Sequence, residues 1–349
     1  MLRGMKDCFA TTDGVDDSGN RTTKKLHDHL AFGGAEGLVS SNYRLPFRTK
    51  DGKTTLNVEC FGSDHAGGDD DDSDWPILLF VPGICESAET WSVQYLAVAA
   101  REHRWRLFVL ELEGHGLSTG KRAVCGNFSR LRGHISEFIQ HVISTEGNEG
   151  VKFAVCGTSL GGILSAYGVE DFVTASKRSE DGCKGFIGAA LIAPAVGIAP
   201  EAIPPAPIVG ALRLMSAVAP SMGFMTPLED PTHYACPSNS TRNCRGHWPL
   251  STSRMLLDVT SKTVKNDQAA GRLVLDDVPS ILVFSGTKDE VVPHNSVKDF
   301  FHNLKTKDKR LIEVSDGDHG IMFDKEKGSI VIKDIFKWLG ECSVKLEPC

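Results

Sequence analysis

The sequence predicts an α/β fold in which a mostly parallel central sheet is covered by helices on both faces. Three observations support this prediction. Short apolar runs alternate with segments whose apolar residues recur at helical spacing. The run Ile77–Val81 is entirely apolar, which is typical of a strand buried on both faces. The alternation stops at Pro194 and resumes at Ile281, so we expect one core that is interrupted by an inserted helical segment.

The expected elements follow one another regularly after a hairpin near the start of the chain. The hairpin pairs strands at residues 43–48 and 54–61 around the turn signal Asp51-Gly52. The later strands are expected at residues 77–81, 105–112, 151–156, 186–193, 281–284 and 310–314. Helices are expected at residues 88–103, 127–145, 161–172, 208–218, 251–264, 294–304 and 328–339.

Local composition divides the chain into a core, an insertion and two tails. Residues 1–40 are poor in large apolar side chains, so we expect a mostly disordered tail. Five prolines between Pro194 and Pro207 inclusive mark the start of the insertion, because no regular element tolerates so many. The predicted organisation is a core at 41–196 and 271–341, a cap or lid at 197–270, and a C-terminal tail at 342–349.

Charge and hydropathy exclude several functions for a chain of 349 residues. A net charge of −7 without a run of basic residues argues against a nucleic-acid partner. No stretch has the uninterrupted apolar length of a membrane span. Acidic residues interrupt the N-terminus where a signal peptide would need an apolar run. We therefore expect a cytoplasmic protein with reduced cysteines, with peripheral attachment to a membrane left open.

The motif Gly157-x-Ser159-x-Gly161 directly follows the expected strand 151–156. A serine on such a strand-to-helix turn has its hydroxyl raised above the sheet edge, as a nucleophile requires. The pentapeptide arises by chance in a chain of this length with a probability of roughly one in four. The motif alone therefore leaves a second interpretation open, in which the segment is a glycine-rich turn and its serine has no catalytic role. The preceding strand and the following helix favour the nucleophile.

Asp289 and His319 each come just after an expected strand. Functional groups gather at the carboxyl ends of the strands in open α/β sheets, so both are expected near Ser159. His319 can take the serine proton near neutral pH and return it to a leaving group. Asp289 would accept the other imidazole N–H and fix the tautomer. Asp318 is the chief rival for the role of the acid.

The loop after the strand 77–81 is expected to complete the site. Gly83 lets the backbone approach a substrate, and the N–H of Ile84 would pair with that of Leu160 as an oxyanion hole. In an alternative interpretation Cys85 is a catalytic thiol, but Ser159 already supplies a nucleophile.

Four motifs in the chain together resemble the monoacylglycerol lipase group of the α/β-hydrolases, the lysophospholipase and serine-aminopeptidase S33-like branch. They are Gly83-x-x-Glu86-Ser87, Gly114-His115-Gly116-Leu117-Ser118, Gly157-Thr158-Ser159-Leu160-Gly161-Gly162 and Gly286-Thr287-x-Asp289. The order Ser159, Asp289, His319 is also that of the α/β-hydrolases. The resemblance covers about residues 41–340 and includes a cap at the expected place.

This resemblance implies a serine hydrolase with Ser159, Asp289 and His319 as its triad and with Ile84 and Leu160 as oxyanion donors. It implies no cofactor and no metal ion. It also implies a cap that shapes an acyl tunnel for a lipid-like ester, such as a monoacylglycerol or a lysophospholipid, and that touches a membrane surface transiently. The alternatives are a peptidase or thioesterase on the same triad, or a non-catalytic ligand-binding protein.

Two departures from the family pattern leave the substrate open. Pro82 stands where the family usually has His. Directly before Gly114-His115-Gly116, the family usually has an acidic residue followed by a basic one, whereas this chain has Glu111-Leu112-Glu113. Neither removes a catalytic group, and we interpret His115 as structural.

Two features of the insertion have alternative interpretations. The expected helix Ile208–Val218 is apolar enough either to pack fully on the core or to present an open apolar face, with Leu212 and Met215 in an acyl channel. The pairs His233-x-x-Cys236 and Cys244-x-x-His247 have the residue types of a zinc site, but an irregular polar loop is the favoured interpretation.

Overall fold

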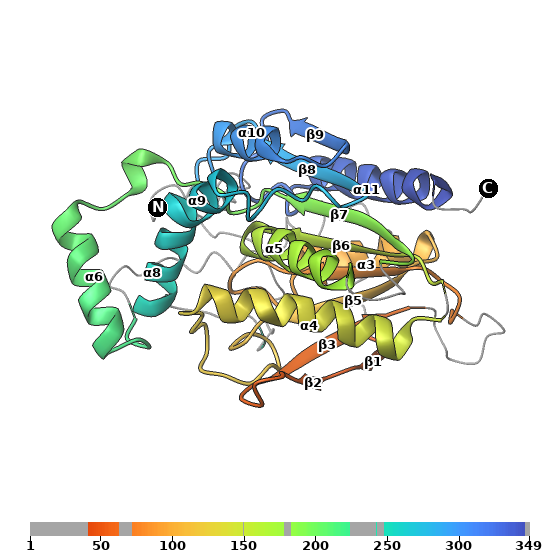
Figure 1. The fold of residues 1–349 in the computed structure, drawn as a ribbon, viewed down its shortest axis with the longest axis horizontal. Helices are drawn as coiled ribbons and strands as arrows, with labels where there is room; N and C mark the ends of the chain where they lie inside the picture. The colour runs from red at the N-terminus through yellow and green to blue at the C-terminus, as the bar shows by residue number, and fades with distance from the viewer. Residues whose placement is uncertain are drawn as a thin grey trace, which may run out of the picture.

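The computed structural model describes residues 41–62, 72–148, 150–177, 183–223, 242 and 248–345. Figure 1 shows helices stacked against one twisted sheet. The expected tail 1–40, the acidic stretch at residues 63–71, and the four His and Cys residues of the zinc alternative lie outside the described residues. None of the described helices is long and apolar enough to cross a membrane.

The sheet is nine-stranded and mostly parallel, as predicted from the alternation of elements. Its order is β1-β3-β5-β4-β6-β7-β8-β9, with β2 pairing with β3 off this path. The pairs β1–β3, β2–β3 and β3–β5 are antiparallel, and every later pair is parallel. The strands are β1 Tyr43–Arg44, β2 Phe47–Arg48, β3 Thr55–Phe61, β4 Ile77–Val81, β5 Arg106–Glu111, β6 Phe153–Thr158, β7 Phe186–Ile192, β8 Ser280–Gly286 and β9 Asp308–Val314.

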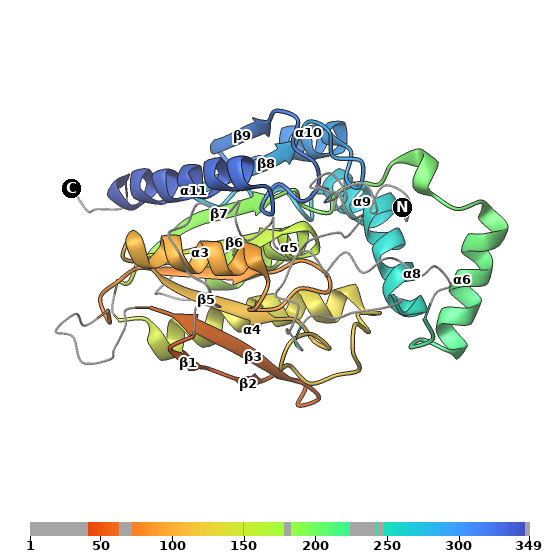
Figure 2. The same ribbon diagram turned by 180° about the vertical axis from the view of Figure 1, so that it is seen from behind.

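Two apolar clusters lie on the two faces of this sheet. The helices α4 (Phe128–Glu146), α5 (Ser159–Ser176) and α10 (His294–Asn303) pack on one face, as the buried residues of that cluster show (Figure 1). The helices α3 (Trp91–Glu102) and α11 (Lys325–Lys345) cover the other face (Figure 2). All five side chains of β4 are fully buried because both faces of the strand are covered.

The chain between β7 and β8 contains a short 3₁₀ turn (Pro200–Ala202) and the helices α6 (Ala206–Val218) and α8 (Leu250–Asp258). A π-helical turn, Val259–Thr263, continues α8 into α9 (Val264–Ala269). Figures 1 and 2 show α6 and α8 beyond one end of the sheet. The hydroxyl of Thr252 attaches α8 to the core, because it donates to the Ala123 carbonyl (2.6 Å) and accepts from the Cys125 N–H (2.8 Å).

Helix α6 has two different apolar faces. Leu212 is buried against Ile198, Leu250 and Leu257, so it belongs to the core of the inserted helices. This corrects the expectation that Leu212 lines an acyl channel. On its other sides α6 exposes large apolar side chains, and Met215 is 43% and Val218 81% exposed. Packing and exposure, treated as alternatives in the sequence, therefore both occur on the same helix.

The C-terminal helix is longer than expected. We predicted a helix at 328–339 and a tail from residue 342, whereas α11 begins at Lys325 and continues to Lys345. Cys342, in the last turns of α11, is buried in the apolar cluster on which the helix packs. Its burial against the core explains why the helix continues past the expected end.

Candidate active site

Ser159 is the first residue of α5 and stands on the sharp turn after β6. Its φ is +50°, in the left-handed region that residues other than glycine rarely adopt. The turn leaves no room for larger neighbours. A Cβ atom at Gly161 would overlap the carbonyl oxygens of Val81 and Pro82, and one at Gly157 would lie 2.5 Å from the Gly161 carbonyl oxygen. The two glycines thus allow a backbone that lifts Ser159 out of the sheet.

The structure brings Ser159, His319 and Asp289 into one chain of hydrogen bonds. The Ser159 Oγ and the His319 Nε2 are 2.8 Å apart, and the His319 Nδ1 is 2.8 Å from the Asp289 Oδ2. An ionised carboxylate can only accept, so Nδ1–H donates to Asp289 and Nε2 is free to accept from the serine hydroxyl. Asp289 is buried, and so is the His319 side chain, which is 8% exposed.

The backbone holds Asp289 in place. Its Oδ1 accepts the N–H groups of Val291 (2.9 Å) and Val292 (2.8 Å), which leaves Oδ2 directed at His319. The loop of the acid also crosses the loop of the histidine, because the Lys288 N–H donates to the Gly317 carbonyl over 2.8 Å. The rival acid, Asp318, instead accepts the N–H of Gly320 (2.9 Å).

Two opposing effects set the basicity of His319. Burial lowers its pKa, because the charged imidazolium loses solvent. The Asp289 carboxylate raises the pKa through its charge and its hydrogen bond, and Asp318 and Glu86 add smaller increases. The net pKa lies above the ordinary value of 6.5. His319 is therefore a stronger base than a free imidazole.

The two expected oxyanion donors belong to the turns on either side of Ser159. Leu160 is the second residue of α5, where a helix offers no intrahelical acceptor for the backbone N–H. Ile84 belongs to the loop after β4. That loop is close to the nucleophile, since a Cβ atom at Gly83 would lie 3.5 Å from the Ser159 Cβ. Both N–H groups thus come from backbone that packs around Ser159.

No role for Glu86 is predicted from the sequence, although its carboxyl group lies in this loop. Its Oε2 accepts the N–H of Gly83 over 3.1 Å. Burial raises the pKa of Glu86 to about 7, while the Gly83 hydrogen bond, His319 and His115 lower it. The signal for Glu86 in the sequence was the motif Gly83-x-x-Glu86-Ser87, in which an acidic residue follows a glycine at a strand end by three positions.

Glu111 is a second residue whose role was not predicted. It is fully buried at the end of β5, and burial raises its pKa. Its carboxylate accepts from the N–H of Ala88 (3.2 Å), the N–H of Leu117 (2.6 Å) and the side-chain amide of Asn57 (2.9 Å). It therefore joins the loop before α3 to the loop that carries His115. His115 is itself completely buried, with its Nδ1 3.0 Å from the Glu113 carbonyl oxygen.

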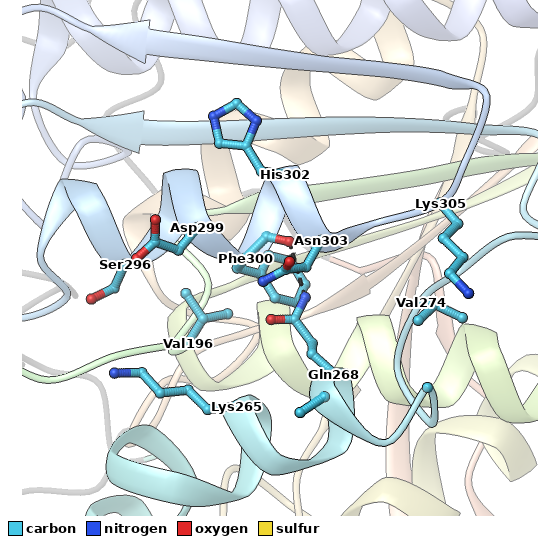
Figure 3. A pocket seen from close by; sticks show the side chains of 12 residues that line it. Val196, Lys265, Gln268, Val274, Ser296, Asp299, Phe300, His302, Asn303 and Lys305 are labelled. Carbon is cyan, nitrogen blue, oxygen red and sulfur yellow. Dashed lines mark hydrogen bonds between the residues drawn. The ribbon is translucent and has the colours of Figure 1, made fainter.

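A separate groove lies between α9 and α10 (Figure 3). Its volume is about 710 Å³, and Val196, Val274 and Phe300 form its apolar part. Gln268 crosses between the two helices and donates to the Phe300 carbonyl over 2.9 Å. The groove contains none of the predicted site residues.

The geometry defines what this site can do chemically. A buried carboxylate, an imidazole and a serine hydroxyl in series allow proton removal from the serine, and two nearby backbone N–H groups can face a developing oxyanion. Among the described residues, no group of three or more His, Cys, Asp or Glu side chains is arranged to hold a metal ion. The sheet, with its serine turn after β6 and its acid and histidine after β8 and β9, defines an α/β-hydrolase.

Comparison with known proteins places the chain more narrowly. The family model for serine aminopeptidase, S33, matches residues 74–326, and the chain belongs to this family. A comparison with curated protein sequences finds no significant match.

Solved structures share the fold at low sequence identity. The monoacylglycerol lipase of Paleococcus ferrophilus is 20% identical with a TM-score of 0.59, and the match covers 82% of this chain and 99% of that one. A soluble variant of monoglyceride lipase from Saccharomyces cerevisiae, in complex with a substrate analog, is 14% identical with a TM-score of 0.66, covering 88% and 97%. Est1E from Butyrivibrio proteoclasticus, with bound ferulic acid, is 14% identical with a TM-score of 0.54, covering 85% and 98%.

Proposed function

We propose that the protein is a serine hydrolase that cleaves carboxylic esters of lipid-like substrates, such as monoacylglycerols or lysophospholipids. The observation that carries this proposal is the chain of hydrogen bonds from Asp289 through His319 to Ser159, with both distances at 2.8 Å. Membership of a hydrolase family supports it.

In the proposed reaction, Ser159 Oγ attacks the ester carbonyl carbon while His319 Nε2 takes the hydroxyl proton. The negative charge that develops on the carbonyl oxygen is stabilised by the N–H groups of Ile84 and Leu160. When the intermediate collapses, the alcohol leaves with the proton from His319 and the acyl group stays on Ser159. Water, deprotonated by His319, then releases the acid and regenerates the serine.

Asp289 stabilises the imidazolium in both half-reactions. Its Oδ2 faces Nδ1, so the proton stays on that nitrogen and Nε2 remains available to the serine. The N–H groups of Val291 and Val292 hold the carboxylate from the other side and prevent it from rotating away.

The apolar surface of the inserted segment supports a lipid-like substrate. Six of the ten large apolar side chains that are exposed among the described residues lie between Ile203 and Met222. They are Ile203, Ile208, Leu214, Met215, Val218 and Met222. Such clustering marks a surface that meets other apolar material. We propose that residues 197–270 act as a cap and that α6 contacts the aggregated lipid or membrane from which the substrate comes.

The proposal is tested by labelling and by substrate profiling. A fluorophosphonate probe should label Ser159 in the folded protein and should fail to label the Ser159→Ala variant. Purified protein is then assayed with p-nitrophenyl esters from acetyl to octanoyl, with monoacylglycerols and with lysophospholipids. Turnover of these esters supports the proposal, whereas unlabelled wild-type protein would indicate a ligand-binding protein without this chemistry.

The family description favours an aminopeptidase as the second candidate. The same triad can cleave an amide, but a peptidase also needs polar anchors for its substrate, and the described part of α6 offers Arg213, which is already paired with Asp258 (2.9 Å). Aminoacyl p-nitroanilides decide between the two candidates: faster turnover of these amides than of octanoyl esters would favour the peptidase.

A further inference from the structure

Two hydrogen bonds between the same two residues close the loop after β4. The N–H of Gly83 donates to Oε2 of Glu86 over 3.1 Å, and the N–H of Glu86 donates to the carbonyl oxygen of Gly83 over 3.3 Å. Between them, Cys85 has a φ of +66°. A residue with a side chain keeps such a conformation only where its surroundings hold it. The two hydrogen bonds between Gly83 and Glu86 therefore stabilise the strained loop, and we call this pair of bonds the brace.

This brace lies directly beside the reacting atoms. Gly83 packs on Ser159, since an added Cβ atom would be 3.5 Å from the Ser159 Cβ and 2.8 Å from Oε1 of Glu86. The N–H of Ile84, one of the two proposed oxyanion donors, belongs to a residue inside the braced loop. The orientation of that N–H depends on the loop that the carboxyl group of Glu86 closes.

We propose that Glu86 is a positioning residue for ester hydrolysis, whose carboxylate holds the Gly83–Glu86 loop in the shape that directs the Ile84 N–H toward the oxyanion. This inference rests on the proposed function. An ionised carboxylate accepts a backbone N–H more strongly than a neutral acid, so the brace is strongest when Glu86 is charged.

The charge of Glu86 is coupled to the general base. The charged or titratable groups that act on Glu86 are the imidazoles of His319 and His115, and the Asp289 and Asp318 carboxylates face His319 in turn. Burial raises the pKa of Glu86 to about 7, and the pKa of His319 also lies above its ordinary value. Both groups take up a proton as the pH falls, and the charge on each acts on the other. Because Glu86 raises the pKa of His319, neutralising Glu86 should make His319 harder to protonate.

The test compares Glu86→Ala and Glu86→Gln with the wild type and with Glu102→Ala, an exposed acidic residue of α3. Glu86→Ala should lower kcat about 10²-fold with little change in KM, because an oxyanion donor acts in the transition state. Glu86→Gln keeps an acceptor oxygen of the same shape, so it should recover most of that loss. The acid limb of its kcat/KM profile should move to lower pH, because His319 loses one of the negative charges that raise its pKa. Glu102→Ala should behave as wild type.

Fluorophosphonate labelling separates failure of this inference from failure of the proposed function. In the transition state of labelling, negative charge develops on the phosphoryl oxygen at the oxyanion position, so Glu86→Ala should label more slowly than wild type by a similar factor. Unlabelled wild-type protein would count against the hydrolase function itself. Wild-type labelling with equal rates in Glu86→Ala, or an unchanged acid limb in Glu86→Gln, would overturn the role of Glu86 alone. A lower thermal midpoint with unchanged kcat would show that Glu86 only stabilises the fold.

Discussion

At the scale of single residues, the site depends on a few side chains that the backbone holds against their ordinary preferences. Ser159 has a left-handed φ, and Asp289 is buried with one oxygen bound to two backbone N–H groups. Strained or desolvated groups of this kind persist only where the surrounding fold fixes them. Substitutions at these positions should therefore change chemistry far more than stability.

Replacing Ser159 with Ala should abolish ester hydrolysis and leave the fold intact. The loss in kcat should be about 10⁴-fold or more, because covalent catalysis disappears with the hydroxyl. Ester hydrolysis assays and circular dichroism spectra check the two parts of the prediction. A variant that keeps more than about a tenth of wild-type activity would show that Ser159 is not the nucleophile, because loss of a triad nucleophile costs far more.

Asp289→Asn should lower kcat by about 10⁴-fold, because an amide at this position favours the wrong imidazole tautomer. The neighbouring Glu290, which is exposed, provides the matched control as Glu290→Gln. Asp318→Asn tests the rival acid and should be mild, because Asp318 bonds to the Gly320 N–H instead. A severe loss in Asp318→Asn with a mild one in Asp289→Asn would reverse the assignment. The measurement is steady-state kinetics on one short-chain ester.

Activity should fall at acid pH as His319 becomes protonated, because the general base must be neutral to accept the serine proton. The pKa of His319 lies above its ordinary value, so the loss should begin at a higher pH than for a free imidazole. The kcat/KM profile of the wild type measures this. In Asp289→Asn, where the main charge that raises the pKa is gone, the residual activity should persist to lower pH; an unshifted limb would contradict the proposed electrostatic cause.

At the scale of elements, α6 shows how one helix can serve two surfaces. It packs Leu212 against α8, and its outer side leaves Leu214 and Val218 exposed. Meanwhile α8 is fastened to the core through Thr252. The inserted helices therefore have an internal core of their own and an apolar outer surface, and substitutions on the two sides should have different effects.

Leu212→Asp should destabilise the inserted helices by about 2–5 kcal/mol, because it deletes buried apolar contacts and buries a carboxylate. Val218→Asp, at a position that is 81% exposed, should leave the thermal midpoint unchanged. It should still weaken turnover of micellar monoacylglycerol by several-fold while sparing soluble acetyl esters. Thermal denaturation and paired assays separate the two variants. Equal activity of Val218→Asp on both substrates would show that this surface does not meet lipid.

At the scale of the whole molecule, the sheet brings together segments that are far apart in the chain. Ser159 follows β6, Asp289 follows β8 and His319 follows β9, and the inserted helices lie beyond the same end of the molecule (Figures 1 and 2).

The value of kcat/KM should rise with acyl length from acetyl to at least octanoyl esters. Each CH₂ group that is buried contributes about 0.8 kcal/mol, so a longer chain gains more from an apolar site than acetate does. A series of p-nitrophenyl esters below their critical micelle concentrations measures this dependence. A flat or falling profile would argue against a lipid-like substrate and favour small esters.

Deleting residues 1–40 should change kcat/KM by less than a few-fold. This segment lacks the apolar content that would offset the entropy of ordering it. The truncated and full-length proteins are compared on the same octanoyl ester. A large loss would mean that the tail takes part in covering or gating the site.

The fold could be predicted from the sequence, and so could the three side chains that the structure joins in one chain of hydrogen bonds. Alternating apolar runs and helical periods predicted the parallel sheet, because strands buried on both faces and amphipathic helices leave different patterns in the chain. The turn at Ser159 was recognisable because its steric demand for glycines is local. Asp289 and His319 followed from one rule, since the carboxyl ends of parallel strands meet at one edge.

Only the tertiary structure decided which neighbours these residues have. The roles of Glu86 and Glu111 depend on backbone N–H groups that the fold brings to their carboxylates, and burial is what raises the pKa of each. The inward face of α6 could not be predicted either, because a helix that is apolar on several sides has no single hydrophobic direction. Leu212 is inside because α8 lies against that face, and residue spacing along one helix carries no information about the position of another.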